Sequence, residues 1–115
     1  MPFKLIVAVV DDTQTDNIIE AARQAGAKGA TIINNARGEG INLHKTFLGL
    51  SLETQRDVIL FIVEATLSQA IYQTIEEAGQ FVSQSGSGIV FQLDLEQVSG
   101  VAQQFSGFDT PNKIN

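Results

Sequence analysis

The sequence predicts an α+β sandwich, in which two helices cover one face of a four-stranded antiparallel sheet. Three observations carry this prediction. Four short runs rich in β-branched residues are spaced along the chain, two amphipathic segments interrupt them, and glycine or paired acidic residues end most of these elements. In chain order the elements run β-α-β-β-α-β, which is the split arrangement of ferredoxin-like folds.

The first three elements follow one another closely. An apolar run from Phe3 to Val10 ends at two aspartates and predicts a buried strand. Thr13 followed by Asp16 resembles a capping box, so we expect a helix to begin there and to stop at Gly26. The segment ATIIN, residues 30–34, is then the second expected strand.

The second half repeats this architecture. RDVILFIV, residues 56–63, predicts a third strand, and IVFQLDL, residues 89–95, predicts a fourth. Between them, Thr66 and Gln69 resemble a second capping box, and Gly79 is the expected end of the helix. The two halves therefore share an order of elements, although their sequences differ.

Length and composition narrow the class of protein. We expect one domain, residues 1–115, with a weakly patterned C-terminal segment, residues 96–115. The net charge of −6 argues against nucleic-acid binding, which usually needs a basic surface. The absence of cysteine excludes disulfides and thiolate metal sites. The apolar start is too short to span a membrane and lacks signal-peptide features, so we expect a cytoplasmic protein without membrane insertion.

Two of the predicted strands are apolar on both faces. In LIVAVV (residues 5–10) and VILFIV (residues 58–63), apolar residues occupy consecutive rather than alternate positions. Two helices can cover only one face of a four-stranded sheet, so the second face needs another cover. Another subunit is the expected cover, and the alternative is that the C-terminal segment folds back over this face.

Catalytic motifs are absent from the sequence, whereas two glycine-rich turns favour anion binding. His44 is the only histidine, and no nucleophile or Walker motif is present, so we expect neither an enzyme nor a metal site. RGEG (residues 37–40) and SGSG (residues 85–88) are turns in which backbone N–H groups can converge on an anion. Arg37 and Arg56 can add charged hydrogen bonds to a phosphate or a carboxylate.

Three stretches of the chain carry a family resemblance: GATIINNARGEG (residues 29–40), the long loop that leads to RDVILFIVE, and GSGIVFQLDLEQV (residues 86–98). Over residues 3–100 the chain resembles the PII signal-transduction proteins and their PII-like relatives. The resemblance implies a homotrimer that binds an adenine nucleotide, and in many members 2-oxoglutarate, in clefts between subunits. It also implies that residues 36–54 are the T-loop region, which controls an enzyme, a transporter or a regulator.

The resemblance assigns roles to particular residues. Thr31 matches the threonine of the family's G-x-T-V strand, and residues 37–40 match its (K/R)-G-x-G at the base of the T-loop. Residues 86–88 match the G-x-G of the phosphate-binding B-loop, and Arg56 is the basic residue nearest to the family's strand lysine. The expected ligand-binding residues are Thr31, Arg37, Gly38, Gly40, Arg56, Gly86, Ser87 and Gly88. The expected partner-binding residues are His44, Lys45, Phe47 and Leu48.

The chain departs from the family pattern at several functional positions. Ile89 replaces the lysine that follows the B-loop, Ile41 replaces the glutamine used for 2-oxoglutarate, and the C-terminal arginine pair is absent. The only tyrosine, Tyr72, lies in the second predicted helix rather than in the T-loop. Each lost charged phosphate contact is worth roughly 1.5–3 kcal/mol. AMP, a cyclic nucleotide or a small carboxylate therefore fits the expected site better than ATP.

Other interpretations stay open at this point. A CutA-type trimer would share the fold and bind a small ligand or a metal, and a plain interaction module would bind nothing at its glycine turns. The stretch from Arg37 to Thr54 also has two interpretations. Its apolar residues, Phe47, Leu48, Leu50 and Leu52, predict a docking loop, whereas a hairpin that extends the second and third strands would be rigid.

Overall fold

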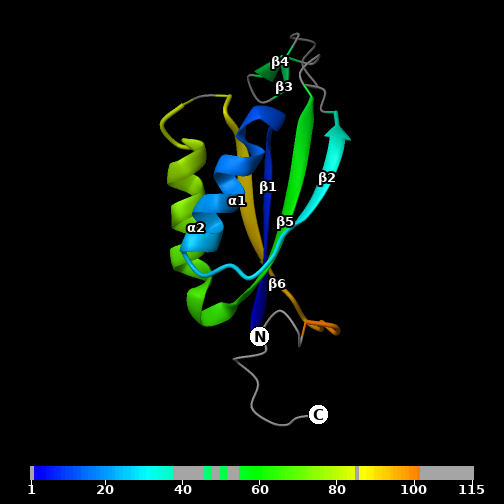
Figure 1. Ribbon diagram of the computed structural model, residues 1–115, viewed down its shortest axis with the longest axis vertical. Helices are drawn as coiled ribbons and strands as arrows, with labels where there is room; N and C mark the ends of the chain where they lie inside the picture. The colour runs from blue at the N-terminus through cyan, green and yellow to red at the C-terminus, as the bar shows by residue number, and fades with distance from the viewer. Residues whose placement is uncertain (1, 38–45, 48–49, 52–54, 85, 102–115) are drawn as a thin grey trace.

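A computed structural model describes residues 2–37, 46–47, 50–51, 55–84 and 86–101 of the chain (Figure 1). Its main strands are β1 (Phe3–Asp11), β2 (Thr31–Ala36), β5 (Arg56–Glu64) and β6 (Gly88–Asp94). Its helices are α1 (Thr15–Gln24) and α2 (Ala65–Gly79), and a 3₁₀ turn, η1 (Asp12–Gln14), leads into α1. Two further short strands are β3 (Thr46–Phe47) and β4 (Leu50–Ser51).

The four main strands form one antiparallel sheet in the order β2-β5-β1-β6. The first strand of the chain thus lies between the third and fourth predicted strands, and the second lies at an edge. This arrangement confirms the ferredoxin-like β-α-β-β-α-β fold that the sequence predicts. β3 pairs only with β4 in a separate two-stranded sheet, so the hairpin extension of the predicted second and third strands does not hold for these described residues.

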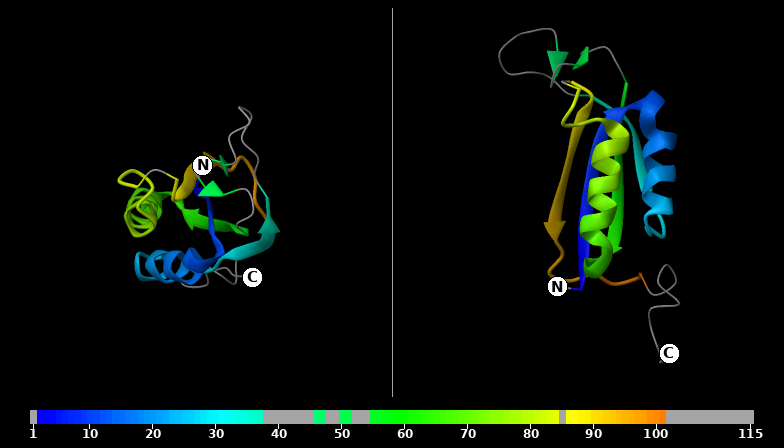
Figure 2. Two further views of the ribbon diagram at one scale, coloured as in Figure 1. Left: turned by 90° about the horizontal axis from the view of Figure 1, so that it is seen from above. Right: turned by 90° about the vertical axis from the view of Figure 1, so that its left-hand side faces the viewer.

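Both helices pack on the same face of the sheet, and the apolar core lies between the two layers (Figure 2). Alternate residues of the two central strands point into this core because side chains along a strand alternate between its faces. The fully buried residues from the strands are Ile6, Ala8, Val10, Ile59, Phe61 and Val63. Those from the helices are Ile18, Ala22, Ile71 and Ile75.

The start of α1 differs from the prediction. Asp11, not Thr13, caps the turn that leads into the helix, because its carboxylate accepts a hydrogen bond from the Thr13 N–H at 3.0 Å. The capping box predicted at Thr13 and Asp16 is therefore wrong. The end of the helix follows the prediction more closely, since α1 stops at Gln24 and Gly26 takes a positive φ of 120°.

The start of α2 differs from the prediction, whereas its end agrees with it. The helix begins at Ala65 directly after β5, without a side-chain hydrogen bond at its N-cap, so the capping box predicted at Thr66 and Gln69 is wrong. The Ala65 N–H instead donates to the Pro2 carbonyl at 2.8 Å. At the other end, the helix stops at Gly79 as predicted, and the next residue, Gln80, takes the left-handed conformation with a φ of 56°.

The core makes a stability prediction. Phe61 is the largest fully buried side chain of the central strands, so Phe61→Ala should lower the free energy of unfolding by about 3–5 kcal/mol. Val82 is 79% exposed, so Val82→Ala is a control that should change this free energy by less than about 0.5 kcal/mol. Urea unfolding followed by circular dichroism measures both. Similar losses for the two variants would contradict the position assigned to the core.

Candidate ligand site at one end of the sheet

The strand ends gather several of the predicted ligand-binding residues at one end of the sheet. Arg56 at the start of β5 pairs with Asp11 of β1 and with Ala36 of β2. Gly88 at the start of β6 pairs with Val10, one residue below Asp11. This is the end of the sheet at the top of Figure 1, and the chain leaves β2 there toward Arg37.

Within one chain, however, Arg37 and residues 86–88 lie at opposite edges of the sheet. β2 and β6 are separated by β5 and β1, which amounts to three strand spacings of about 4.8 Å, or roughly 14 Å. Arg37 and residues 86–88 therefore do not meet on one subunit. Gly38 and Gly40 lie outside the described residues, as do His44, Lys45 and Leu48, and Phe47 is described only as part of β3.

The turn before β6 is held by its own hydrogen bonds. The Ser87 hydroxyl donates to the Gln80 carbonyl at 3.0 Å, and the Ser87 N–H donates to the Gln84 carbonyl at 3.3 Å. Gly88 has a φ of 139°, and a β-carbon there would lie 2.3 Å from the Val9 carbonyl oxygen. Packing against β1 thus already requires glycine at position 88, and its replacement would disturb the β1–β6 pairing as well as any bound ligand.

Arg56 is packed into the end of the sheet. Its side chain is 2% exposed and lies opposite Asp11. The pKa of the Asp11 carboxyl is lowered mainly by the hydrogen bond from the Thr13 N–H, and the Arg56 charge contributes to the same shift. The role of Arg56 as a ligand contact stays a prediction, because a single subunit does not present this guanidinium to solvent.

Thr31 lies lower on β2 and borders a small recess on the face of the sheet away from the helices. The recess has a volume of about 100 Å³. Its lining residues are Leu5, Gly29, Ala30, Thr31, Leu60 and Ile62. Thr31 is the one polar side chain among them, so this recess suits a flat, mostly apolar group that takes a hydrogen bond from the threonine, rather than a bare anion.

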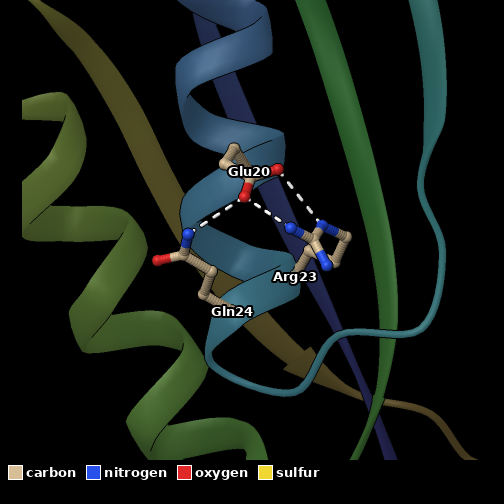
Figure 3. Close-up of polar contacts among 3 residues, drawn as sticks. All are labelled: Glu20, Arg23 and Gln24. Atoms are coloured by element: carbon tan, nitrogen blue, oxygen red, sulfur yellow. Dashed lines mark hydrogen bonds and ion pairs between the residues drawn. The ribbon is translucent and has the colours of Figure 1, made fainter.

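Two cations lie on the other face of the sheet, around the end of α1. Arg23 and Lys28 border a second small recess that shares Gly29 and Ala30 with the first. Figure 3 shows that Arg23 is engaged by Glu20: its Nε donates to Glu20 Oε1 at 3.1 Å. This ion pair raises the pKa of Arg23 and lowers that of Glu20. Arg23 borders the recess on the helix-covered side and is not among the residues that line the Thr31 recess.

One buried polar residue of this region was missed by sequence reasoning. Asp57 follows Arg56 in β5, is 5% exposed, and accepts hydrogen bonds from Thr15 and Asn34. The sequence carried a signal for it, because Asp57 alternates with the buried residues Ile59 and Phe61 and so belongs to the helix-covered face.

Searches for other kinds of site add two findings. Among the described residues, no group of three or more histidine, cysteine, aspartate or glutamate side chains is placed to hold a metal ion. None of the helices in the described part of the chain has the length and apolar character needed to cross a membrane.

The topology defines a ferredoxin-like α+β domain, and comparison with known proteins gives the family. The sequence model of the nitrogen regulatory protein P-II family matches residues 3–104, and the chain belongs to this family. The resemblance stated from the sequence is thereby confirmed. A comparison with curated protein sequences gives no match.

Solved structures with the same fold come from bacteria and a plant. CPII from Thiomonas intermedia K12, bound to ADP, AMP and acetate, is 22% identical with a TM-score of 0.68, and the match covers 89% of this chain and 93% of CPII. Arabidopsis thaliana PII bound to citrate is 19% identical with a TM-score of 0.62, over 82% of this chain and 78% of that protein. A PII-like signalling protein from Thermus thermophilus is 26% identical with a TM-score of 0.58, over 80% of this chain and 85% of that protein.

The cap at Asp11 makes a pH-dependent prediction. Its pKa is lowered in the fold, so its charge stabilises the protein at every pH above the unfolded-state pKa, and this contribution is lost as the pH falls through the folded-state pKa. Asp11→Ala should therefore cost about 1 kcal/mol at pH 7 and clearly less at pH 3. Asp12→Ala, at the next position, should change the free energy of unfolding by less than about 0.5 kcal/mol at pH 7. An Asp11→Ala cost that is the same at both pH values would contradict this role.

Proposed function

We propose that the protein is a trimeric PII-like signalling protein that binds a small anionic effector, an adenine nucleotide or a carboxylate, in clefts between subunits. It controls a partner protein through residues 36–54, its T-loop region. One observation carries the proposal: Arg37, after β2, and residues 86–88, at the start of β6, lie at opposite edges of the sheet, so that a site shared by them needs two copies of the chain.

The open face of the sheet supports such an assembly. Strand register aligns apolar side chains across this face in three rows. The rows are Ile62–Leu5–Leu93, Leu60–Val7–Phe91 and Val58–Val9–Ile89. Neither helix packs on this face, and Phe91 is 42% exposed. A contiguous apolar surface of this kind is unfavourable in water and is a typical subunit interface.

The alternative cover, the C-terminal segment, gains no support from its described part. Residues Leu95 to Ser99 lie beside Pro2 and Phe3 at the lower end of the sheet in Figure 1, rather than across the open face. Residues 102–115 lie outside the described residues. A second and third copy of the chain therefore remain the proposed cover.

One charged substitution on the open face of the sheet tests whether the chain forms a trimer. The wild-type chain should scatter light as a particle of about three times 12.4 kDa at micromolar concentration. Phe91→Glu puts a carboxylate into the middle row of the open face and should give a monomer with unchanged far-UV circular dichroism, because Phe91 lies outside the helix-covered core. Val82→Glu lies outside this face and should stay trimeric. If the wild-type chain is a monomer at that concentration, the proposed trimer is wrong.

The ligand is proposed to carry less negative charge than ATP. The recess at Thr31 offers an apolar surface and one hydroxyl, and Ile89 stands where the family has a phosphate-binding lysine. The related structures contain ADP, AMP, acetate and citrate, which supports nucleotides and small carboxylates as the ligands to test. AMP, citrate and bicarbonate are the first candidates for this chain.

Restoring the lost charge tests the site. In calorimetry, the wild-type chain should bind AMP or citrate and should bind ATP no more tightly than AMP. Ile89 lies in the row of the open face nearest to the proposed site, so light scattering should first show that Ile89→Lys is still trimeric. In that trimer the lysine should improve ATP affinity by roughly tenfold to hundredfold and AMP affinity by less, because a charged hydrogen bond to phosphate is worth roughly 1.5–3 kcal/mol. Ile89→Met is the uncharged control. No binding of any of these compounds at millimolar concentration would remove the ligand site and favour an interaction module without an effector.

A further inference from the structure

The buried carboxylate of Asp57 has no part in the proposed ligand site, yet it connects three elements near that site. Its side chain lies on the helix-covered face of β5, at the end of the sheet where Arg56 and Arg37 lie. Burying a carboxylate is unfavourable unless hydrogen bonds replace its water shell. The two groups that donate hydrogen bonds to Asp57 therefore indicate its structural role.

Each oxygen of Asp57 accepts one hydrogen bond from a different element. Oδ2 accepts from the hydroxyl of Thr15, the first residue of α1, at 2.6 Å. Oδ1 accepts from the Nδ2 of Asn34, in β2, at 3.0 Å. A carboxylate can accept on both oxygens, whereas a carboxamide can accept on only one. An aspartate at position 57 thus joins β5, α1 and β2 through a single side chain.

Asn34 lies where the pairing of β2 with β5 becomes irregular. Ile33 stands opposite Val58, but Ala36 stands opposite Arg56, so that both Asn34 and Asn35 face Asp57. β2 therefore contains one extra residue, a β-bulge. Asn35 takes a left-handed φ of 64°, a conformation that asparagine tolerates better than most residues with a side chain.

The bulge changes the face on which β2 ends. Ile33 and Val58 lie on the open face of the sheet, and side chains alternate along a strand, so an unbroken β2 would put Ala36 on the helix-covered face. With the extra residue, Ala36 stands beside Arg56 on the open face instead. Arg37 follows immediately, so the bulge sets the direction in which Arg37 leaves the sheet.

We infer that Asp57 is a positioning residue for the ligand site. Its hydrogen bond to Asn34 keeps β2 bulged and so fixes the position of Arg37, and its hydrogen bond to Thr15 ties this bulge to the start of α1. The effect on ligand affinity rests on the proposed function, because it requires that Arg37 contacts the effector. The effect on the bulge does not.

Exchanging the carboxylate and the carboxamide between positions 57 and 34 tests the hydrogen bond that joins them. Asn34→Asp places a second carboxylate against Asp57 and should open the bulge by repulsion. Amide hydrogen exchange at residues 34–37 should become at least tenfold faster, and AMP should bind at least tenfold more weakly. The double variant Asn34→Asp with Asp57→Asn restores the pair in reverse: the new carboxamide donates to position 34 and accepts from Thr15. Both quantities should return to within about threefold of wild type.

Two further variants separate positioning from general stability. Val63→Ala lowers the melting temperature from the other end of the same strand, where Val63 is fully buried opposite Lys4, so it should leave AMP affinity and exchange at residues 34–37 unchanged. Asn34→Ala removes the donor without adding a charge, and should show the same changes as Asn34→Asp to a smaller degree. It also serves as the test variant if Asn34→Asp does not fold.

The measurements test two claims separately: that Asp57 holds the bulge in β2, and that the bulge positions Arg37 for ligand binding. If the double variant is no better than Asn34→Asp, or if exchange at residues 34–37 does not respond to Asn34→Ala, the role of Asp57 in the bulge is overturned. If exchange responds while the AMP affinity of a ligand-binding protein stays constant, the positioning of Arg37 is overturned. If the wild type binds neither AMP nor citrate, the proposed function fails, and the exchange measurements still decide whether Asp57 holds the bulge.

Discussion

Both helices pack on one face of the four-stranded sheet, so neither of them covers the other face. The apolar residues of the central strands, the register of the sheet and the proposed assembly all depend on this arrangement. β1 and β5 are apolar on both faces, so hydrophobic pattern alone does not distinguish their correct register from a slip of one residue. Polar and glycine contacts mark the register of the sheet. Between β1 and β5, Asp11 lies opposite Arg56. Lys4 pairs with Asp94 at 3.3 Å across β1 and β6, and Gly88 allows the close approach of Val9. One register therefore gives both the covered core and the open face.

The two adjacent residues that begin β5 hold the corner where β1 turns into α1. Because neighbours along a strand point to opposite faces, Arg56 lies opposite Asp11 on one side of the sheet, and Asp57 reaches Thr15 on the other. Asp11 in turn caps the 3₁₀ turn η1, which connects β1 to α1. The proposed ligand site is built at this corner, so the groups that hold it are also those that the site would need to keep in place.

The sequence allowed the order of elements and the two-faced strands to be predicted, because both follow from hydrophobic periodicity within short windows. The helix starts were missed for local reasons: Asp11 begins a 3₁₀ turn before α1, and β5 runs into α2 without a capping side chain. The Asp57 contacts and the bulge were missed because they depend on distant residues. The burial of Arg56 was equally hidden, since a charged residue at a strand start usually lies in water.

The contacts of Asp57 have a consequence for how the domain can change over evolution. Asp57 and Asn34 are 23 positions apart, yet their hydrogen bond joins the two ends of the segment between β2 and β5. The entropy of closing such a segment rises slowly with its length, by about 0.6 kcal/mol for each doubling. Insertions, deletions or replacements within it thus cost the sheet little as long as its two ends stay joined. The segment can therefore change in length while the strand pairing beneath it stays the same.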